Sequence, residues 1–487
     1  MDLEYNFNFK KYLNSVEKCD PIAYVGYVTA VNGLEILSNG PYSKIGEICT
    51  IKVPGKMDLT AEVVGLDGKI VKLTVLGSTD GIEVGCEVVG SGKPLMVPVG
   101  SSLLGRVINA SGRPIDGKGE LVPDTYYPAV KSAPNALSRL DTNRRITCGV
   151  RAIDSMLTVA KGQRLGIFAG SGVGKSTLLS MIARNTDADV NVIGLIGERG
   201  REVPDFIRRD LGVEGLKKSV IVVATSDEPS ICRLRAAQVT TAVAEYFRDQ
   251  GKDVMLMMDS VTRFAHAQRE IALANGEPPA QKGYPPSVFD MIPKLLERSG
   301  NNDKGTITAF YTVLVDGDDM NEPITDKVRG TLDGHIVLSR RLAQAYHYPA
   351  IDVMQSISRL SKRVTGKETQ KAVGKIRQWM SVYQTNEQMI NAGIYQGGSS
   401  PEIDAAIEKH LAIEDFLKQE EYDRCLMKET LEKLQELTGV EIPEEEYSEF
   451  AGQKRMTTAQ IADNMSAVQE ASETASPSVL EENNDSE

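Results

Sequence analysis

The stretch from 163 to 179, which reads QRLGIFAGSGVGKSTLL, constrains the fold more than any other part of the chain. An apolar run at 165–168 leads into a loop with three glycines, and Lys175, Ser176 and an apolar helical pattern follow. A strand, a glycine-rich loop and a helix in this order are the context in which a phosphate-binding P-loop is expected. The first glycine of the usual pattern is Ala169 here. That position bounds the loop without cradling phosphate, so we expect the loop to keep its function.

The chemistry of this loop follows from its residue types. Glycines allow the backbone to turn its N–H groups inward around phosphates, and the N-terminus of the following helix adds positive potential. Lys175 adds a full charge, and the Ser176 hydroxyl is a ligand for Mg²⁺. The flanking strand and helix disfavour the alternative, a glycine-rich turn that binds nothing. The predicted nucleotide-binding residues of the loop are Gly170, Ser171, Gly172, Val173, Gly174, Lys175, Ser176 and Thr177.

Length and composition limit the other possibilities. A chain of 487 residues is too long for one core and should form about two to four domains. No apolar stretch approaches the length of a membrane span, and the first residues lack the features of a secretory signal, so we expect a protein inside the cell. Six scattered cysteines without a CxxC pair argue against a zinc site or a disulfide framework. A net charge of −12 makes nucleic acid an unexpected partner.

Short β-rich runs separated by Gly and Asp turns occupy residues 24–96. Strands at this spacing predict a small closed barrel. No catalytic constellation occurs in it, so we expect a structural or assembly role. The predicted strands are Tyr24 to Val31, Ile45 to Val53, Leu59 to Val64, Ile70 to Val75 and Cys86 to Val89.

After the P-loop, apolar strand candidates alternate with helical patterns. This alternation predicts an α/β fold, with a mostly parallel sheet that helices cover on both faces. Ligands of such sheets bind beyond the carboxyl ends of the strands, so the residues that follow each run are candidates for a site. The predicted strands are Val190 to Ile196, Val220 to Ala224, Val254 to Met258, Ile307 to Val315 and Ile336 to Leu338.

Two carboxylates stand at such positions. Glu198, in GERGREV, is placed to orient or deprotonate a water opposite the γ-phosphate, although a solvated charge run is the alternative. Arg199 belongs to the same charged cluster. Asp259 ends VMLMMDS and is the expected partner of a P-loop, where a carboxylate holds the Mg²⁺ shell. Arg263, four residues further on, either reaches the site or pairs with Glu270 on a helix.

The segment YHYPAIDVMQSISR, from 346 to 359, supplies two weaker candidates. Tyr348 offers a flat ring for stacking an adenine, and Arg359 could neutralise charge on a transferred phosphoryl group. A core aromatic and a surface ion pair are equally good explanations of these two residues.

The segment from 103 to about 442 resembles the protein-export ATPases of bacterial flagella and type III secretion systems, relatives of the catalytic subunits of rotary ATP synthases. PAID, with the serines after it, follows a pattern shared by the whole rotary family, whereas GEPPAQKGYPPSVF and DGDDMNEP resemble the export branch. The strings that carry the resemblance are AGSGVGKST, GERGREV, VMLMMDSVTRFAHAQREIALANGEPPAQKGYPPSVF, GTITAFYTVLVDGDDMNEPITD, LDGHIVLSRR and YPAIDVMQSISR.

The resemblance implies Mg²⁺-dependent hydrolysis of ATP that energises protein export. It implies that Lys175 and Ser176 hold phosphates and magnesium, that Glu198 is the catalytic carboxylate, and that Asp259 serves the metal. Its remaining implied site residues are Tyr348 against adenine and Arg359 as an arginine finger in the neighbouring subunit's site, with Arg199 and Arg263 as further catalytic candidates from the residue pattern.

The resemblance also implies partners and a location. It implies a homohexamer, a stalk-like regulatory protein bound by the N-terminal segment, and a rotor-like stalk and export gate facing the C-terminal helices. Export chaperone–substrate complexes are further implied partners, and nucleic acid is not. The protein would then act at the cytoplasmic face of the bacterial inner membrane, attached through its partners.

The expected organisation has five parts. They are a partner-binding segment at 1–23, a β-barrel domain at 24–96, a P-loop ATPase domain at 97–375, a helical domain at 376–442 and an acidic, disordered tail at 443–487.

Three alternatives remain open from the sequence. The first is the ATPase of a virulence-type type III secretion system, whose motifs are nearly the same. The second is a rotary synthase subunit, disfavoured by the export-type strings. The third is a nucleotide-binding scaffold without turnover, against which Glu198 argues, because a scaffold needs no water-activating carboxylate.

Overall fold

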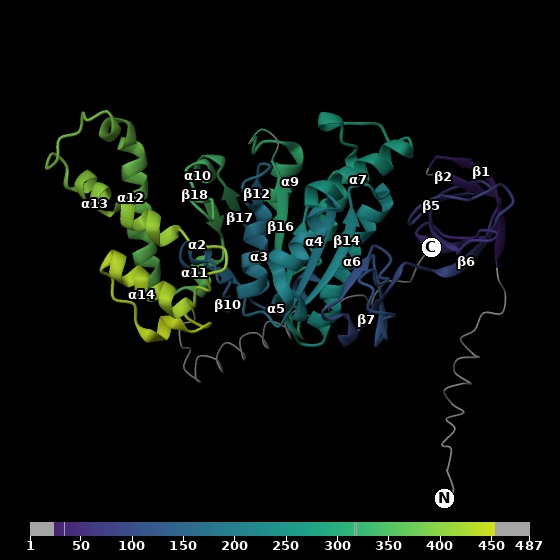
Figure 1. The fold of residues 1–487 in the computed structure, drawn as a ribbon, viewed down its shortest axis with the longest axis horizontal. Helices are drawn as coiled ribbons and strands as arrows, with labels where there is room; N and C mark the ends of the chain where they lie inside the picture. The colour runs from purple at the N-terminus through teal and green to yellow at the C-terminus, as the bar shows by residue number, and fades with distance from the viewer. Residues whose placement is uncertain (1–23, 34, 316, 318, 453–487) are drawn as a thin grey trace, which may run out of the picture.

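The computed structural model describes residues 24–33, 35–315, 317 and 319–452. The predicted N-terminal partner segment and most of the acidic tail lie outside the described residues. Along the long axis of the molecule, the barrel lies at one end, the central sheet in the middle and the C-terminal helices at the other end (Figure 1).

Six antiparallel strands close the N-terminal barrel, in the order β1-β2-β5-β4-β3-β6. Their alternating side chains fill its interior, where Ile36, Ile51 and Leu73 are fully buried. The predicted barrel is confirmed, although β2 was not predicted, because it has only four residues. The strands are β1 Val25–Asn32, β2 Glu35–Ser38, β3 Glu47–Lys52, β4 Leu59–Asp67, β5 Ile70–Val75 and β6 Glu87–Pro94.

An eight-stranded sheet, in the order β18-β17-β12-β16-β15-β13-β14-β8, forms the centre. All neighbours are parallel except β17 and β18. The middle strands are buried over nearly their whole length, as expected for a parallel sheet covered on both faces. The strands are β8 Val107–Asn109, β12 Arg164–Ala169, β13 Val190–Glu198, β14 Ser219–Thr225, β15 Asp253–Asp259, β16 Thr306–Leu314, β17 Gly334–Leu338 and β18 Ile351–Ser358.

The mostly parallel α/β sheet is confirmed, and its two edge strands are additions to the prediction. The segment at 346–359 is a strand for most of its length, not only a source of two site candidates. Ile351 and Val353 alternate inward, but the outer half of β18 exposes Gln355 and Ile357, which weakens the pattern. β8 has three residues, too few to show a period.

Helices cover both faces of this sheet and build two large apolar clusters. The longest, α6 (Ser230–Asp249), is buried along most of its length. The others are α2 Arg151–Met156, α3 Lys175–Asn185, α4 Glu202–Asp205, α5 Gly212–Lys217, α7 Val261–Ala274, α8 Pro286–Leu296, α9 Pro323–Thr331, α10 Arg340–Gln344 and α11 Ser361–Val364. Two-stranded sheets pair β7 (Met96–Val99) with β9 (Thr125–Pro128), and β10 (Arg145–Ile146) with β11 (Val159–Ala160).

The C-terminal helices are α12 (Lys367–Asn391), α13 (Pro401–Leu417) and α14 (Met427–Thr438). The predicted helical character of this region is confirmed. Because α12 runs without a break through the boundary expected at 375, we propose that the helical domain begins at Lys367. Among the described residues, no helix is long and apolar enough to cross a bilayer.

Candidate functional site

The P-loop lies between β12 and α3, at the carboxyl edge of the parallel strands. Gly172 and Gly174 have φ values of 78° and 96°, a left-handed conformation that residues with a side chain rarely adopt. Gly174 is the N-cap of α3, and no side chain of the described residues caps this helix. Backbone N–H groups of the first turn are therefore available to an anion.

Three charged side chains meet beside this loop. Lys175 Nζ lies 2.6 Å from Asp259 Oδ1 and 3.6 Å from Glu198 Oε1. Asp259 comes from the end of β15 and Glu198 from the end of β13, two neighbouring parallel strands. A cavity of about 150 Å³ is lined by both carboxylates and by Ser176. The structure thus brings together four of the predicted site residues.

Burial and the neighbouring charges shift the pKa values of this cluster. Burial, followed by the nearby charge of Asp259, raises the pKa of Glu198 to about 7. Burial by itself would lower the pKa of Lys175, but the charges of Asp259 and Glu198 outweigh it and raise that pKa. Thr312 donates a hydrogen bond to Asp259 Oδ1 at 2.8 Å and fixes the carboxylate.

The two predicted arginines of this region have different surroundings. Arg263 lies in the first turn of α7, packed so closely on Gly197 that a Cβ there would lie 2.9 Å from the Cβ of Arg263. Its Nε is buried and has no hydrogen-bond partner among the described residues. Glu270 does not pair with it but with Arg233, at 2.6 Å.

Arg199 is not drawn into the cluster. Its side chain is 69% exposed, and its guanidinium contacts Glu202 at 3.2 Å. For this residue the geometry supports the simpler reading, a solvated charge on the rim of the site.

Tyr348 lies on the other side of the P-loop. A Cβ added to Gly174 would be 3.9 Å from its ring, and the ring is partly exposed. Tyr346 and Tyr348, together with residues 418–421 that follow α13, line a cavity of about 580 Å³ beside the loop. The Gln419 N–H donates to the Tyr348 carbonyl at 2.9 Å.

Residues 418–421 were missed in the sequence. Their composition, KQEE, is that of an ordinary exposed helix end, and they are far from the P-loop along the chain. Only the tertiary contact with Tyr348 places them at the site.

Arg359 lies at the opposite edge of the sheet from its own P-loop. Because β18 is antiparallel, Ile351 pairs with Leu338 at the P-loop edge, whereas Ser358 pairs with Gly334 at the other edge. The six residues of β12 between these edges span about 17 Å. Among the described residues, no hydrogen bond or ion pair holds the exposed Arg359 guanidinium.

The residues present fit a magnesium nucleotide. The backbone N–H groups at the start of α3 and the Nε of Arg263 can donate hydrogen bonds. The oxygens of a phosphate chain can accept them. The Ser176 hydroxyl and the Asp259 carboxylate are the hard oxygen ligands that Mg²⁺ prefers. The tyrosine-lined cavity fits a flat base.

Three family models match the chain. Residues 28–92 match the β-barrel domain of the ATP synthase alpha/beta family, and residues 149–358 match its nucleotide-binding domain. Residues 365–436 match the C-terminal domain of the type III secretion ATPase EscN.

Curated relatives match over most of their length. A flagellum-specific ATP synthase of Treponema pallidum is 56% identical over 433 residues, which cover 89% of this chain and 97% of the relative. The protein of the same name from Bacillus subtilis is 53% identical and covers 88% and 98%. A type 3 secretion system ATPase of Xanthomonas euvesicatoria is 47% identical and covers 85% and 94%.

Among solved structures, the assembled ATPase EscN from the enteropathogenic E. coli type III secretion system matches with a TM-score of 0.80 and 43% identity, covering 85% of this chain and all of EscN. EscN in complex with its central stalk EscO matches with a TM-score of 0.79. The sequence resemblance is confirmed: the chain belongs to the family of flagellum-specific and type III secretion ATPases.

Proposed function

We propose that this ATPase hydrolyses ATP with Mg²⁺ in a homohexameric ring and thereby energises protein export by a bacterial flagellar apparatus. The observation that carries the proposal is the position of Arg359, at the edge of the sheet opposite to the P-loop. The cluster of Lys175, Glu198 and Asp259 lies at one edge and Arg359 at the other, so a complete site needs a neighbouring subunit.

In this proposal, the residues of the P-loop edge position the nucleotide. The P-loop N–H groups and Lys175 hold the β- and γ-phosphates. Ser176 and Asp259 would hold Mg²⁺, which would withdraw charge from the phosphates. Arg263 supplies its unpaired Nε to the terminal phosphate. Tyr348 packs against the base.

Hydrolysis is an in-line attack of water on the γ-phosphate. Glu198 accepts a hydrogen bond from this water and orients it, and its burial, which raises its pKa, favours its taking up a proton. The neighbour's Arg359 neutralises the charge that develops on the transferred group. Positioning and charge neutralisation supply most of the rate. Arg199, which is exposed and contacts Glu202, takes no part in this step.

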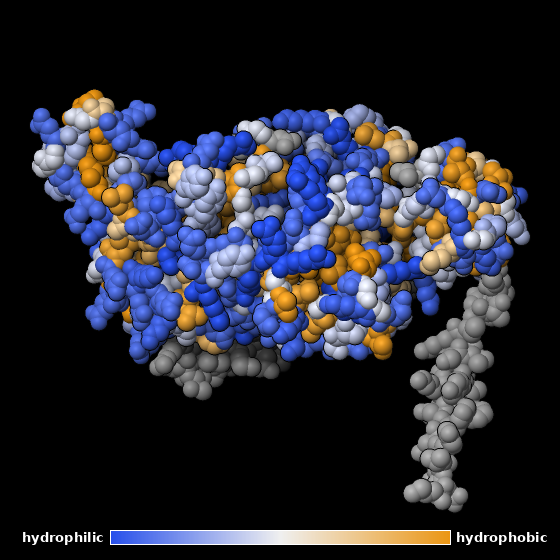
Figure 2. Space-filling model, in the orientation of Figure 1, coloured by the Kyte–Doolittle hydropathy of each residue, from blue (hydrophilic) through white to orange (hydrophobic). Residues whose placement is uncertain are grey.

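The ring also accounts for exposed apolar groups. Figure 2 shows apolar surface over the barrel. In the barrel domain, Tyr42, Met57 and Ile45 are 87%, 80% and 69% exposed. Such side chains favour contacts with other chains. EscN has been solved as an assembly and with a central stalk, which supports a ring and a stalk partner for this chain.

The remaining partners are part of the same proposal. They are a regulatory stalk-like protein at the N-terminal segment, the export gate, and chaperone–substrate complexes. Attachment through them would hold the ring at the cytoplasmic face of the inner membrane. Flagellar export is favoured over virulence secretion by the higher identity to the flagellum-specific relatives, 56% and 53%, than to the Xanthomonas relative, 47%.

Phosphate release from ATP and Mg²⁺, followed over a wide range of protein concentration, tests the mechanism. Specific activity should rise with concentration and fall to background for Arg359→Ala. Full activity of an isolated Arg359→Ala monomer would contradict the shared site. Deletion of the gene should remove flagella, whereas intact flagella with lost secretion of other proteins would indicate the virulence system.

A further inference from the structure

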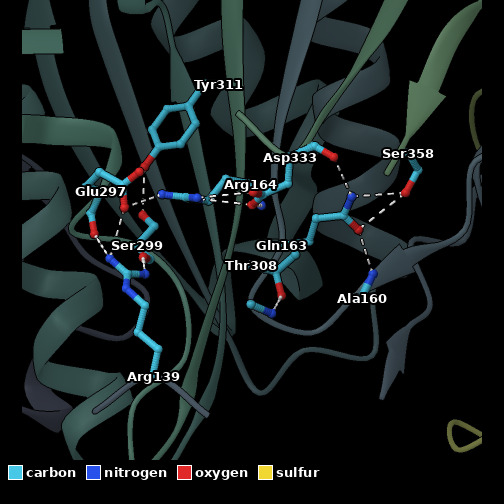
Figure 3. Close-up of polar contacts among 11 residues, drawn as sticks. Arg139, Ala160, Gln163, Arg164, Glu297, Ser299, Thr308, Tyr311, Asp333 and Ser358 are labelled. Carbon is cyan, nitrogen blue, oxygen red and sulfur yellow. Dashed lines mark hydrogen bonds and ion pairs between the residues drawn. The ribbon is translucent and has the colours of Figure 1, made fainter. Parts of the chain in front are cut away.

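A polar network that joins Gln163, Asp333 and Ser358 lies at the edge of the sheet opposite to the P-loop (Figure 3). Ser358 immediately precedes Arg359 in the chain. The centre of the network is Gln163, which is fully buried and immediately precedes β12. Gln163 Nε2 donates to Ser358 Oγ at 3.0 Å and to the Asp333 carbonyl at 3.2 Å. Its Oε1 accepts from the Ala160 N–H at 2.9 Å, so the side chain amide is held from both ends.

The same groups hold the backbone of Arg359. The Asp333 carbonyl that accepts from Gln163 also accepts the Arg359 N–H, at 3.1 Å. Ser358, the residue before Arg359, also donates through Oγ to the Thr158 carbonyl at 2.9 Å. The Arg359 guanidinium has no such support among the described residues, so its direction depends on the backbone that carries it.

Asp333 is itself fixed to β12. Arg164 contacts its carboxylate through two side-chain nitrogens, Nε at 3.0 Å and Nη2 at 3.1 Å, and through its backbone N–H at 3.0 Å. Arg164 Nη1 lies 2.6 Å from Glu297, which also contacts Arg139. Close packing adds to this, since a Cβ on Gly334 would lie 2.4 Å from the Ile357 carbonyl oxygen. The backbone at 358–359 therefore has little freedom relative to β12.

We propose that Gln163, through Ser358 and Asp333, is a positioning residue for Arg359 and so serves the site of the neighbouring subunit and not its own. β12 then carries the P-loop at one end and the support of the arginine finger at the other. This inference rests on the proposed function of Arg359 in a shared site. In addition, β12 of each subunit would connect the nucleotide bound by its own P-loop to the active site that its Arg359 completes in the neighbouring subunit.

Mixing of full-length subunits before ring assembly tests this. Lys175→Ala abolishes a subunit's own site but leaves its Arg359 intact. Gln163→Met, which keeps the side-chain length but removes the amide, should lower turnover by about 10- to 100-fold, because misplacement of a catalytic group by about 1 Å has an effect of this size. Affinity of its own site for a fluorescent nucleotide should be unchanged.

The mixture decides where the defect acts. Lys175→Ala subunits provide an intact Arg359. A mixture of Gln163→Met with Lys175→Ala subunits should therefore be more active than the sum of the two separate preparations. A mixture of Arg359→Ala with Lys175→Ala subunits should behave in the same way. In a random one-to-one ring, about a quarter of the head-to-tail interfaces combine an intact P-loop with an intact finger. Ser358→Ala, a smaller change, should show a weaker form of the same behaviour.

Thr308→Val is the matched control. Thr308 Oγ1 accepts from the Gly162 N–H at 2.9 Å beside Gln163, but among the described residues no hydrogen bond or ion pair joins Thr308 to Asp333, Ser358 or Arg359. The Thr308→Val variant should keep near wild-type turnover.

The outcomes of the mixing experiment separate the inference from the proposed function. If Lys175→Ala subunits rescue Arg359→Ala but rescue neither Gln163→Met nor Ser358→Ala, the inference is wrong while the shared site stands. If Arg359→Ala is not rescued either, the shared site fails and the inference with it. Wild-type turnover of both Gln163→Met and Ser358→Ala would also overturn it.

Discussion

The two edges of the central sheet differ in how their charged groups are paired. At the P-loop edge, two carboxylates crowd around one lysine, and Arg263 Nε has no partner among the described residues. At the opposite edge, Arg298 and Glu245 form a buried ion pair with two hydrogen bonds, at 3.0 and 2.9 Å. The charged groups of the first edge suit a phosphate chain, whereas Arg298 and Glu245 at the second edge pair with each other.

This difference has a physical origin. Buried polar groups left without partners reduce stability, and they persist where a ligand completes them. A buried ion pair whose hydrogen bonds are made within the chain, such as that of Arg298 and Glu245, resists rearrangement instead. The P-loop edge should therefore tolerate substitutions that abolish activity, whereas substitution within the Arg298–Glu245 pair should first reduce the free energy of unfolding.

The largest expected effect is on turnover at the P-loop edge. Glu198→Gln should lower phosphate release about 10³-fold, because the proton acceptor for water is lost. The unfolding temperature without nucleotide should stay the same or rise, since repulsion from Asp259 and the burial of a carboxylate are relieved. Steady-state kinetics and thermal unfolding check both. Near wild-type hydrolysis would contradict the role of Glu198.

A large stability effect is expected at the opposite edge. Arg298→Leu leaves the Glu245 carboxylate, 1% exposed, buried without its partner, and should cost about 3–5 kcal/mol. Denaturant unfolding measures this. The double variant Arg298→Leu with Glu245→Leu should recover much of the loss, because no unpaired charge remains. Equal destabilisation in the single and double variants would mean that packing, not charge, dominates.

An intermediate effect, on nucleotide affinity, is expected at the tyrosine-lined cavity beside the P-loop. Tyr348→Ala should weaken nucleotide binding about 10-fold or more, from the loss of about 1–3 kcal/mol of stacking. Tyr348→Phe keeps the ring and is the control, with an affinity close to wild type. Titration with a fluorescent nucleotide measures both, and equal affinities of the Ala and Phe variants would remove Tyr348 from the site.

The smallest effect concerns pH at the opposite edge. Burial alone would raise the pKa of Asp253, but hydrogen bonds from Lys161 and Thr306 outweigh it and lower that pKa. A lowered folded-state pKa stabilises the fold above the unfolded pKa, about 3.9, and this contribution is lost as the pH falls from there through the folded-state pKa. Asp253→Asn should therefore be less stable near neutral pH by about 1 kcal/mol or less.

Unfolding of Asp253→Asn and wild type, followed from about pH 7 to about pH 3, measures this. The gap in stability between the two proteins should narrow towards the acid end of this range. A stability gap that stays constant through this range would show that the carboxylate charge is not its source.

Much of the fold and the site could be predicted from local sequence. The P-loop needs neighbouring residues only, and the long apolar runs that end in Glu198 and Asp259 are continuous because both faces of those strands are buried. Parallel topology then brings these carboxylates to the loop. The barrel strands could also be predicted from local sequence, because only one of their faces is buried and apolar residues therefore alternate with a period of two.

Other features depend on contacts between distant parts of the chain, and only the tertiary structure decided them. Residues 418–421 line the cavity beside Tyr348 because the chain after α13 returns to this tyrosine. No local sequence pattern predicts this contact. Gln163, although inside the most informative stretch of the sequence, acquires its partners from residues about 170 and 195 positions away. The antiparallel course of β18 places Arg359 beyond the reach of its own P-loop, because a single reversed strand exchanges the two edges of the sheet.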